Sequence, residues 1–562
     1  MTQTVEKPAP AGVDVVGRHR GLVLRTFLIS SLTLSSRLIG FAREALAAAM
    51  FGDRSTINDA FVTAWAIPNL FRSLLGEGAM STAVQPAITR ADAERGNEAG
   101  RALFLAIARV LCLILLVLCA SVMVLVHFMP DRMPVTGWAW LGTDPGPVRE
   151  LTIRMMPFVI LVCLSALASG ALNVRGHFLA PSLAPVLMNV CWIGALVGVG
   201  VYWGWTRQPG ASDAQEYARQ LTMVRWLSAF ALVAGVVLLL VQVPALASTG
   251  FLGKRRAGAG AAPPRVPSKQ VFDVLKVSAP LALGAAVYQV NVLVDRWMAL
   301  GMLGKGGASV LYYATRVQQF PMSLVSIAAT SAVFPLLTAL GHRRDLANLR
   351  ALHDRTQHAI AFVAIPASVG LLFFTEPIVS VIFRHGEFSQ GGVDRASDAL
   401  RFLTLAILPA GAAGLVARTY YALGDFRTPV RISVLVLIAN VLLNLLFVRG
   451  FGMEVGGLTL ATATTAWANL LILSPGLRSR LGLPGAQPDF FPRLLRILAA
   501  AMASSFLAWL MYCGLHRDGK HSAVLLLGSI AVSVALYAAL SHFLRIPEWS
   551  HVVERVRGRA RN

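Results

Sequence analysis

Apolar segments long enough to cross a membrane recur along most of this chain. Of its 562 residues, 56% are hydrophobic and only 14% are charged, and the mean hydropathy is +0.63. A soluble domain carries about 25% charged residues, whereas a helix needs ~20 apolar residues to span a bilayer. The composition therefore predicts an all-α, polytopic membrane protein and argues against a water-soluble one.

The apolar pattern predicts about fourteen transmembrane helices. Segments longer than ~20 residues must tilt, kink or project from the bilayer. The predicted segments are 22–51, 58–78, 102–129, 149–174, 180–204, 225–247, 271–303, 308–340, 355–384, 395–423, 429–449, 455–474, 492–514 and 522–545.

Basic residues gather in alternating short loops. The chain has 50 Lys and Arg against 28 Asp and Glu, which gives a net charge of +22. Because cytoplasmic loops of membrane proteins carry such an excess, both termini are predicted to be cytoplasmic. The charge is thus explained without nucleic acid, and no nucleic-acid-binding motif occurs. The basic loops lie around residues 18–20, 90–101, 254–269, 343–350, 478–480 and 555–561.

The stretch 248–270 interrupts the apolar pattern after six predicted helices. It is rich in Gly, Pro, Lys and Arg, which is typical of a linker. The sequences on its two sides resemble each other, since STAVQPAI (81–88) echoes TSAVFPLL (330–337) and Pro68 and Pro321 have the same offset as Arg43 and Arg296. Parallel repeats of this kind occur in transporters. The alternative is a chance similarity between helices rich in small residues.

The predicted organisation is two six-helix lobes followed by a C-terminal helix pair. In chain order it comprises a cytoplasmic N-terminal extension (1–21), an N-lobe (22–247), a basic cytoplasmic linker (248–270), a C-lobe (271–474), the C-terminal pair (475–545) and a basic cytoplasmic tail (546–562).

Arginines lie inside predicted membrane helices, among them Arg37, Arg43, Arg72 and Arg316. An arginine at the bilayer centre costs ~2.5–3.5 kcal/mol on insertion scales, so several of them imply a compensating anion or a water-filled cavity. Planar guanidinium groups suit bidentate binding of phosphate oxygens. Arg43, Arg72 and Arg316 come from three helices, and we expect them to converge on a central cavity that takes a negatively charged ligand.

The alternative is that these arginines pair within the protein or reach the membrane interface. Candidate acidic partners are Glu44, Asp59 and Glu77. Pro68 breaks its helix locally, and Asn69 and Arg72 then share one helix face. Arg37 and Arg43 lie on different faces of an ideal helix, so Arg37 need not face the same cavity.

A second polar group lies in the C-terminal half and comprises Asp295, Asn440, Asn444 and Thr462. The two asparagines are spaced i, i+4 and share a face. Hard oxygen ligands of this kind suit a small cation such as Na⁺. The alternative is that Asp295 pairs with Arg296 or Arg316 and that the asparagines join helices by hydrogen bonds.

The sequence contains no catalytic signature and no cofactor motif. HExxH, GxSxG, Walker A and DDxxD-like patterns are missing. The five cysteines form no CxxC pair and are interpreted as buried apolar side chains. An enzyme is therefore not expected, since one that acts on polyprenyl diphosphates would need a carboxylate or histidine beside the arginines.

Several specific motifs lie in residues 35–88, namely SRxxGFxRE, NDAF, IPNLFR and GEGAxSxAxxP. YYATRVQQFP, YYALGDFRTPV and GLTLAT follow in the C-terminal half. From about residue 25 to 545 the chain resembles the MurJ (MviN) family of lipid II flippases, which belongs to the multidrug/oligosaccharidyl-lipid/polysaccharide exporter superfamily.

The resemblance implies a fold with two six-helix lobes plus a C-terminal pair. It implies transport of lipid II, the undecaprenyl-diphosphate-linked peptidoglycan precursor, from the inner to the outer leaflet of the cytoplasmic membrane. Some family members carry Asp where this chain has Asn444. The implied site residues are Arg37, Arg43, Arg72 and Arg316 with Asn69 and the acidic partners Asp59 and Glu77, and, for sodium, Asp295, Asn440, Asn444 and Thr462.

We therefore expect an alternating-access lipid II flippase of cell-wall synthesis. The prenyl tail would lie in a groove formed by residues 475–545, and Na⁺ or the membrane potential would drive transport. Expected partners are lipid II and the bilayer, with cell-wall synthesis or division proteins as further candidates. The alternatives are an exporter of another polyprenyl-diphosphate-linked glycan or of drugs, an integral-membrane enzyme, and a scaffold of the division machinery.

Overall fold

The computed structural model describes residues 15–76, 79–128, 146–252, 266–326, 333–482, 490–516 and 522–560. Every regular element that these residues form is a helix, which confirms the predicted all-α class. Residues 1–14 of the predicted extension and 253–265 of the predicted linker lie outside the described residues. Helix α1 begins at Val15, earlier than the predicted start at residue 22.

The helices before the linker form the first half of the molecule. They are α1 (Val15–Phe51), α2 (Thr56–Phe71), the π-helical turn η1 (Arg72–Gly76), α3 (Ala79–Arg95), α4 (Asn97–His127), α5 (Gly146–Met155), α6 (Phe158–Val174), α7 (Leu179–Trp203), α8 (Asp213–Leu240) and α9 (Val243–Ser248).

The helices after the linker form the second half and the C-terminal part. They are α10 (Ser268–Met302), α11 (Gly307–Ser326), α12 (Phe334–His342), α13 (Leu346–Phe373), α14 (Thr375–Phe383), α15 (Gln390–Thr404), α16 (Ile407–Ala422), α17 (Arg427–Leu445), the π-helical turn η4 (Leu446–Gly450), α18 (Val455–Arg480), α19 (Phe490–Leu515), α20 (Ala523–Phe543) and α21 (Pro547–Ala560).

Each predicted membrane segment overlaps one of these helices or a pair of consecutive helices. Within the described residues, nine spans are long and apolar enough to cross a membrane, and α15 with α16, bent by 42°, makes a tenth if the pair is one span. The number of about fourteen crossings stays a prediction. Two helices, α3 and α21, were not predicted. In α3, Val84, Ile88 and Ala91 are buried, which explains a helix in a polar stretch.

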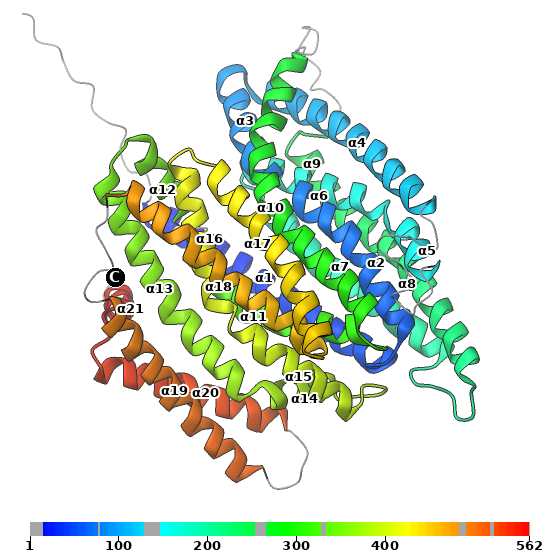
Figure 1. Cartoon of the computed structure of the whole chain (residues 1–562). Coiled ribbons are helices and arrows are strands. Elements are labelled where there is room, and N and C mark those ends of the chain that lie inside the picture. The colour runs from blue at the N-terminus through cyan, green and yellow to red at the C-terminus, as the bar shows by residue number, and fades with distance from the viewer. Residues whose placement is uncertain are drawn as a thin grey trace, which may run out of the picture.

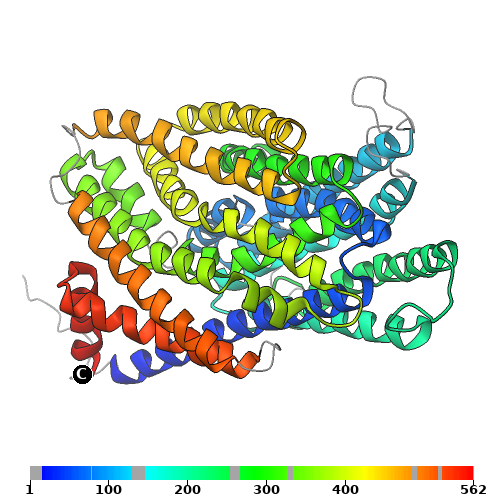
Figure 2. The same ribbon diagram turned by 60° about the horizontal axis from the view of Figure 1, so that its bottom comes forward.

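Helices α2–α9 and α12–α18 lie on opposite sides of the molecule, while α1 extends behind the second half (Figure 1). On one side α7 packs against α1 and α8, and α3 packs against α4 and α6. On the other side α18 packs against α15, α16 and α17. The pair α19 and α20 lies at the edge of the molecule, against α13 (Figure 2). Helices α10 and α11 contact α2, so they bring the two halves together.

Candidate functional site

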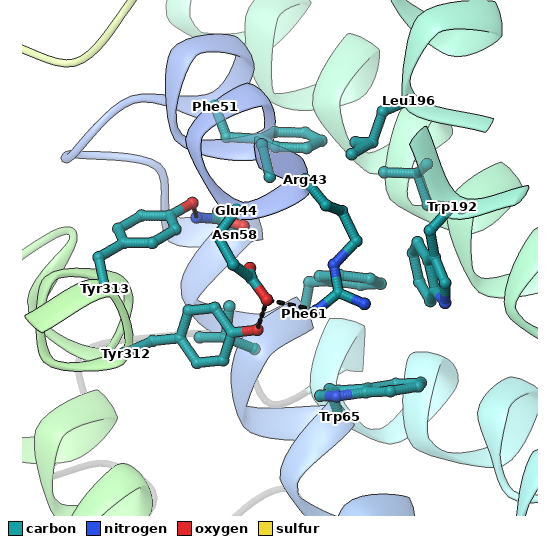
Figure 3. A pocket seen from close by; sticks show the side chains of 13 residues that line it. Arg43, Glu44, Phe51, Asn58, Phe61, Trp65, Trp192, Leu196, Tyr312 and Tyr313 are labelled. Atoms are coloured by element: carbon teal, nitrogen blue, oxygen red, sulfur yellow. Dashed lines mark hydrogen bonds and ion pairs between the residues drawn. The ribbon is translucent and has the colours of Figure 1, made fainter. Parts of the chain in front are cut away.

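A small cavity lies where α1, α2, α7, α8 and α11 meet. Its polar lining includes Arg43, Glu44 and Asn58, and its aromatic lining includes Trp192 and Tyr312 (Figure 3). Its volume is about 40 Å³, which accommodates a few waters but not a sugar or a diphosphate. The cavity is therefore too small to hold the diphosphate in this conformation.

Glu44 is the centre of this cluster. Its Oε1 atom forms an ion pair with the Arg43 guanidinium from the same helix. The Tyr312 hydroxyl on α11 donates to the same oxygen at 2.7 Å, and Arg316 Nε lies 3.6 Å from it. Arg43 and Glu44 belong to the first half, whereas Tyr312 and Arg316 belong to the second. One buried carboxylate therefore joins the two halves.

Contacts with α7 fix the other side of Arg43. Its Nη1 atom donates to Asn189 Oδ1 at 3.1 Å, and its guanidinium lies 5.7 Å from the centre of the Trp192 ring. Asn189 Nδ2 in turn donates to the Ser36 carbonyl at 3.0 Å. These contacts hold the guanidinium facing the cavity, as Figure 3 shows.

Arg316 lies one helical turn beyond Tyr312. Its Nη2 atom donates to the Tyr312 hydroxyl at 3.1 Å and its Nη1 atom to Gln319 Oε1 at 2.9 Å. The Arg316 side chain is 26% exposed, more than the 16% of Arg43. The structure thus brings Arg43 and Arg316 together on Glu44, as the sequence predicted for two of the three cavity arginines.

Asp59 was predicted to pair with an arginine, but it instead binds backbone N–H groups of the second half. Its two carboxylate oxygens accept hydrogen bonds from the backbone N–H groups of Gly306 and Ser309, each at 2.7 Å. These groups form the N-terminus of α11, where free N–H groups and the helix dipole favour a negative charge. The neighbouring Asn58 donates to Ser309 Oγ and to Tyr313 Oη, each at 3.0 Å.

The two halves also meet closely where α1 ends. Asp53 accepts hydrogen bonds from Ser389 N at 2.8 Å and Ser389 Oγ at 3.1 Å, and Glu387 N donates to the Ala49 carbonyl at 2.8 Å. Gly306 has φ +84°, and a Cβ at this position would overlap the Asp53 backbone. Only glycine combines this backbone angle with such a close approach. This end of the interface, which we call the seam, is therefore sealed at the backbone level.

The remaining predicted arginines lie apart from the cavity lining. Arg37 Nη1 donates to Ser323 Oγ on α11, which is a further contact between the halves. Arg72, at the start of η1, donates to Asn69 Oδ1 from Nε at 3.1 Å and from Nη2 at 2.9 Å. The predicted partner Glu77 lies outside the described residues.

The predicted cation-site residues form one buried hydrogen-bonded network. Asn444 Nδ2 donates to Asp295 Oδ1 at 2.8 Å and to Asn440 Oδ1 at 3.1 Å, and Thr462 Oγ1 donates to Asp295 Oδ2 at 3.4 Å. Among the described residues, Asp295 forms no close ion pair with Arg296 or Arg316, although Arg296 acts on its charge at longer range. The second alternative, amides that join helices, matches the geometry of α10, α17 and α18.

Sequence reasoning missed Tyr312 and Arg296 and considered Glu44 only as an internal ion partner. The signals were present, since Glu44 follows Arg43, Tyr312 belongs to the YYATR motif and Arg296 has the repeat offset from Arg43. Arg296 is 8% exposed, its Nη1 atom lies 3.4 Å from the Val62 carbonyl, and its guanidinium lies 4.5 Å from the Tyr312 ring centre.

Comparisons with known proteins agree on one family. Residues 47–527 match the family model described as lipid II flippase MurJ. The lipid II flippase MurJ of Burkholderia cenocepacia is 31% identical over 91% of this chain and 94% of that protein. The probable lipid II flippase MurJ of Vibrio cholerae is 27% identical over 91% of this chain and 94% of that protein.

Solved structures show the same fold. A lipid II flippase MurJ in an inward closed conformation aligns with a TM-score of 0.68 at 22% identity, over 92% of this chain and 99% of that one. An inward-facing multidrug resistance MATE family transporter of the MOP superfamily aligns with a TM-score of 0.62 at 14% identity, over 81% of this chain and 98% of that one.

Proposed function

The chain belongs to the lipid II flippase MurJ family, and we propose that it holds the diphosphate of lipid II at the cluster of Arg43, Glu44 and Arg316. As a member of that family it is a membrane transporter, and its substrate is lipid II. The observation that carries the proposed site is the shared carboxylate, since Glu44 from one half accepts from groups of both halves.

In this proposal Glu44 occupies the place that a phosphate takes during transport. Carboxylate and phosphate oxygens present similar acceptors to guanidinium groups, and Arg binds either in a bidentate way. A diphosphate that enters between the lobes would compete with Glu44 for Arg43 and Arg316. The ion pairs that close the cavity would thereby open as substrate binds, and no covalent bond would be made or broken.

The transport cycle follows from alternating access of the two lobes. Residues 22–247 would rock against 271–474, with the linker 248–270 between them, and the headgroup would cross in the central cavity. The prenyl tail would stay in lipid along the groove of residues 475–545. We propose that transport runs from the inner to the outer leaflet of the cytoplasmic membrane, with both termini and the segments 1–21 and 546–562 cytoplasmic. The seam then lies on the outer side.

The network around Asp295 is our candidate for the coupling-ion site. Asn444 Oδ1 is buried and has no hydrogen-bond partner among the described residues. Oxygens of Asp295 and Asn440 lie beside the Asn444 side chain, and Thr462 Oγ1 lies 3.4 Å from Asp295 Oδ2. Such a set of hard oxygen donors fits Na⁺. Bound sodium would supply positive charge to this cluster, while the membrane potential remains the other candidate driving force. Sodium should raise the melting temperature of the wild type but not of Asp295→Asn, with potassium as the control.

Lipid II exposure at the outer cell surface tests the proposed site. The protein is depleted in its native cell and replaced by wild type, Arg43→Ala, Arg72→Ala or Arg316→Ala. Arg43→Ala and Arg316→Ala should reduce the lipid II exposed at the cell surface, although the variant proteins reach normal levels in the membrane. Arg225→Ala is the matched control, because Arg225 pairs with Glu150 inside the first half at 2.8 Å. Full exposure with Arg43→Ala and Arg316→Ala would exclude the site.

A further inference from the structure

A fourth arginine, Arg296, lies behind Tyr312 and belongs to none of the sites assigned above. We propose that Arg296 is a further substrate-binding residue, which takes the second phosphate of the diphosphate after Tyr312 moves aside. This inference rests on the proposed function. It specifies which residues bind each of the two phosphates of the substrate.

Arg296 interacts with the nearby carboxylates of Glu44 and Asp295 only at long range. The residue is 8% exposed, and its polar contact is with the Val62 carbonyl on α2, at 3.4 Å from Nη1. Among the described residues, no carboxylate lies within ion-pair distance of it. Its chain neighbour Asp295 is held by Asn444 and Thr462 on the side of α17 and α18.

A buried cation without an anion is costly, because transfer from water removes its hydration and one carbonyl does not replace it. Arg43 and Arg316 share this problem only in part, since both approach Glu44. Glu44 forms ion pairs with Arg43 and Arg316, whereas Arg296 has no ion-pair partner among the described residues. A diphosphate esterified at both ends keeps one ionised oxygen on each phosphorus, so it offers a second anionic oxygen for Arg296.

The Tyr312 ring lies against both Arg296 and Arg316. The guanidinium of Arg296 lies 4.5 Å from the ring centre and that of Arg316 lies 4.7 Å from it. The ring is held by the hydrogen bond from its hydroxyl to Glu44 at 2.7 Å. When a phosphate displaces Glu44, that bond is lost and the ring is free to turn. Arg296 and Arg316 then face the same space, on either side of one phosphate group.

The simpler explanation for Arg296 is that it fastens the lobes through the Val62 carbonyl. Val62 lies on α2 and Arg296 on α10, so the hydrogen bond does cross between the halves. A neutral donor would suffice for such a bond, however, and would avoid the cost of a buried charge. The two explanations predict different properties for Arg296→Gln, which keeps a donor and loses the charge.

Binding of two matched ligands to the full-length protein in nanodiscs distinguishes these roles. The ligands are short-chain lipid II and its analogue with a single phosphate in the linkage. We expect the wild type to prefer the diphosphate, Arg296→Gln to lose about tenfold or more of that preference, and Arg296→Lys to lose less. Arg401→Gln is the control, because Arg401 pairs with Asp398 on the surface of α15 at 2.7 Å.

Three outcomes decide between the proposals. An unchanged preference in Arg296→Gln, with equal weakening for both ligands, assigns Arg296 to lobe fastening and overturns this inference. A wild type that binds neither ligand would contradict the proposed function itself. A preference that falls in Arg43→Gln and Arg316→Gln but not in Arg296→Gln leaves the proposed function intact and removes Arg296 from the site.

Discussion

Glu44→Gln is the sharpest test of the closed interface between the two lobes. The substitution keeps the shape of the side chain and removes its charge, so Arg43 and Arg316 lose the carboxylate that they share. Because that carboxylate links the lobes, the variant should weaken the closed conformation more than the fold of either lobe. We therefore expect a shift between conformations rather than a general loss of protein.

The size of this shift follows from burial. Removing one partner of a buried ion pair costs ~3–5 kcal/mol. The side chains of Arg43 and Arg316 are 16% and 26% exposed, so some solvent screening remains and the lower end applies. A cost of about 3 kcal/mol corresponds to about a hundredfold change in the ratio of closed to open molecules.

Single-molecule distance measurements report this ratio directly. Labels at Gln208 and Gln390, both exposed at the seam end of opposite lobes, follow its opening in nanodiscs without substrate. We expect wild type to populate mainly the short distance and Glu44→Gln to populate the long one. Glu150→Gln is the matched control, since Arg154 and Arg225 of the same lobe hold Glu150. A distance distribution for Glu44→Gln identical to wild type would refute the reasoning.

Three further predictions use the same structure. Asp59→Asn weakens the cap on α11 by ~1 kcal/mol, so the distance assay should show a shift of only about fivefold, against about a hundredfold for Glu44→Gln. Tyr312→Phe removes one hydrogen bond to Glu44, worth ~0.5–1.5 kcal/mol, and should give a shift of about tenfold or less. Burial raises the pKa of Asp425, but hydrogen bonds from Thr428 outweigh it and hold that pKa below its ordinary value. Its stabilisation is therefore present above pH ~3.9 and lost as pH falls through the folded pKa, so thermal melts of Asp425→Asn should depend less on acid than those of wild type.

The sequence predicted the helical segments because hydrophobic length is a strong signal in membrane proteins. It failed at α3, whose polar composition hides the buried stripe of Val84, Ile88 and Ala91. A stripe of three small and medium side chains gives little hydropathy, and only the packing against α4 and α6 reveals it. Segments of this kind require tertiary information.

The candidate site was predicted only in part, for a geometric reason. Charged residues are easily recognised within apolar segments, so Arg43 and Arg316 could be predicted from the sequence. Which acid they meet depends on helix rotation and crossing, and a change of one position along a helix turns a side chain by about 100°. Asp59 therefore caps α11 whereas Glu44 meets both arginines, and the sequence does not distinguish these outcomes.

The numbers of carboxylates and arginines in the cavity also affect how readily the lobes close again after the substrate has left. A cavity with as many carboxylates as arginines would close tightly without substrate and would resist displacement by a phosphate. If the cavity held arginines alone, their positive charges would repel one another in the empty protein, and the lobes would not close again after release. With Glu44 between Arg43 and Arg316, the lobes have one internal anion that closes the empty protein. Because Arg296 has no ion-pair partner among the described residues, a bound diphosphate would gain a contact that the empty protein does not satisfy internally.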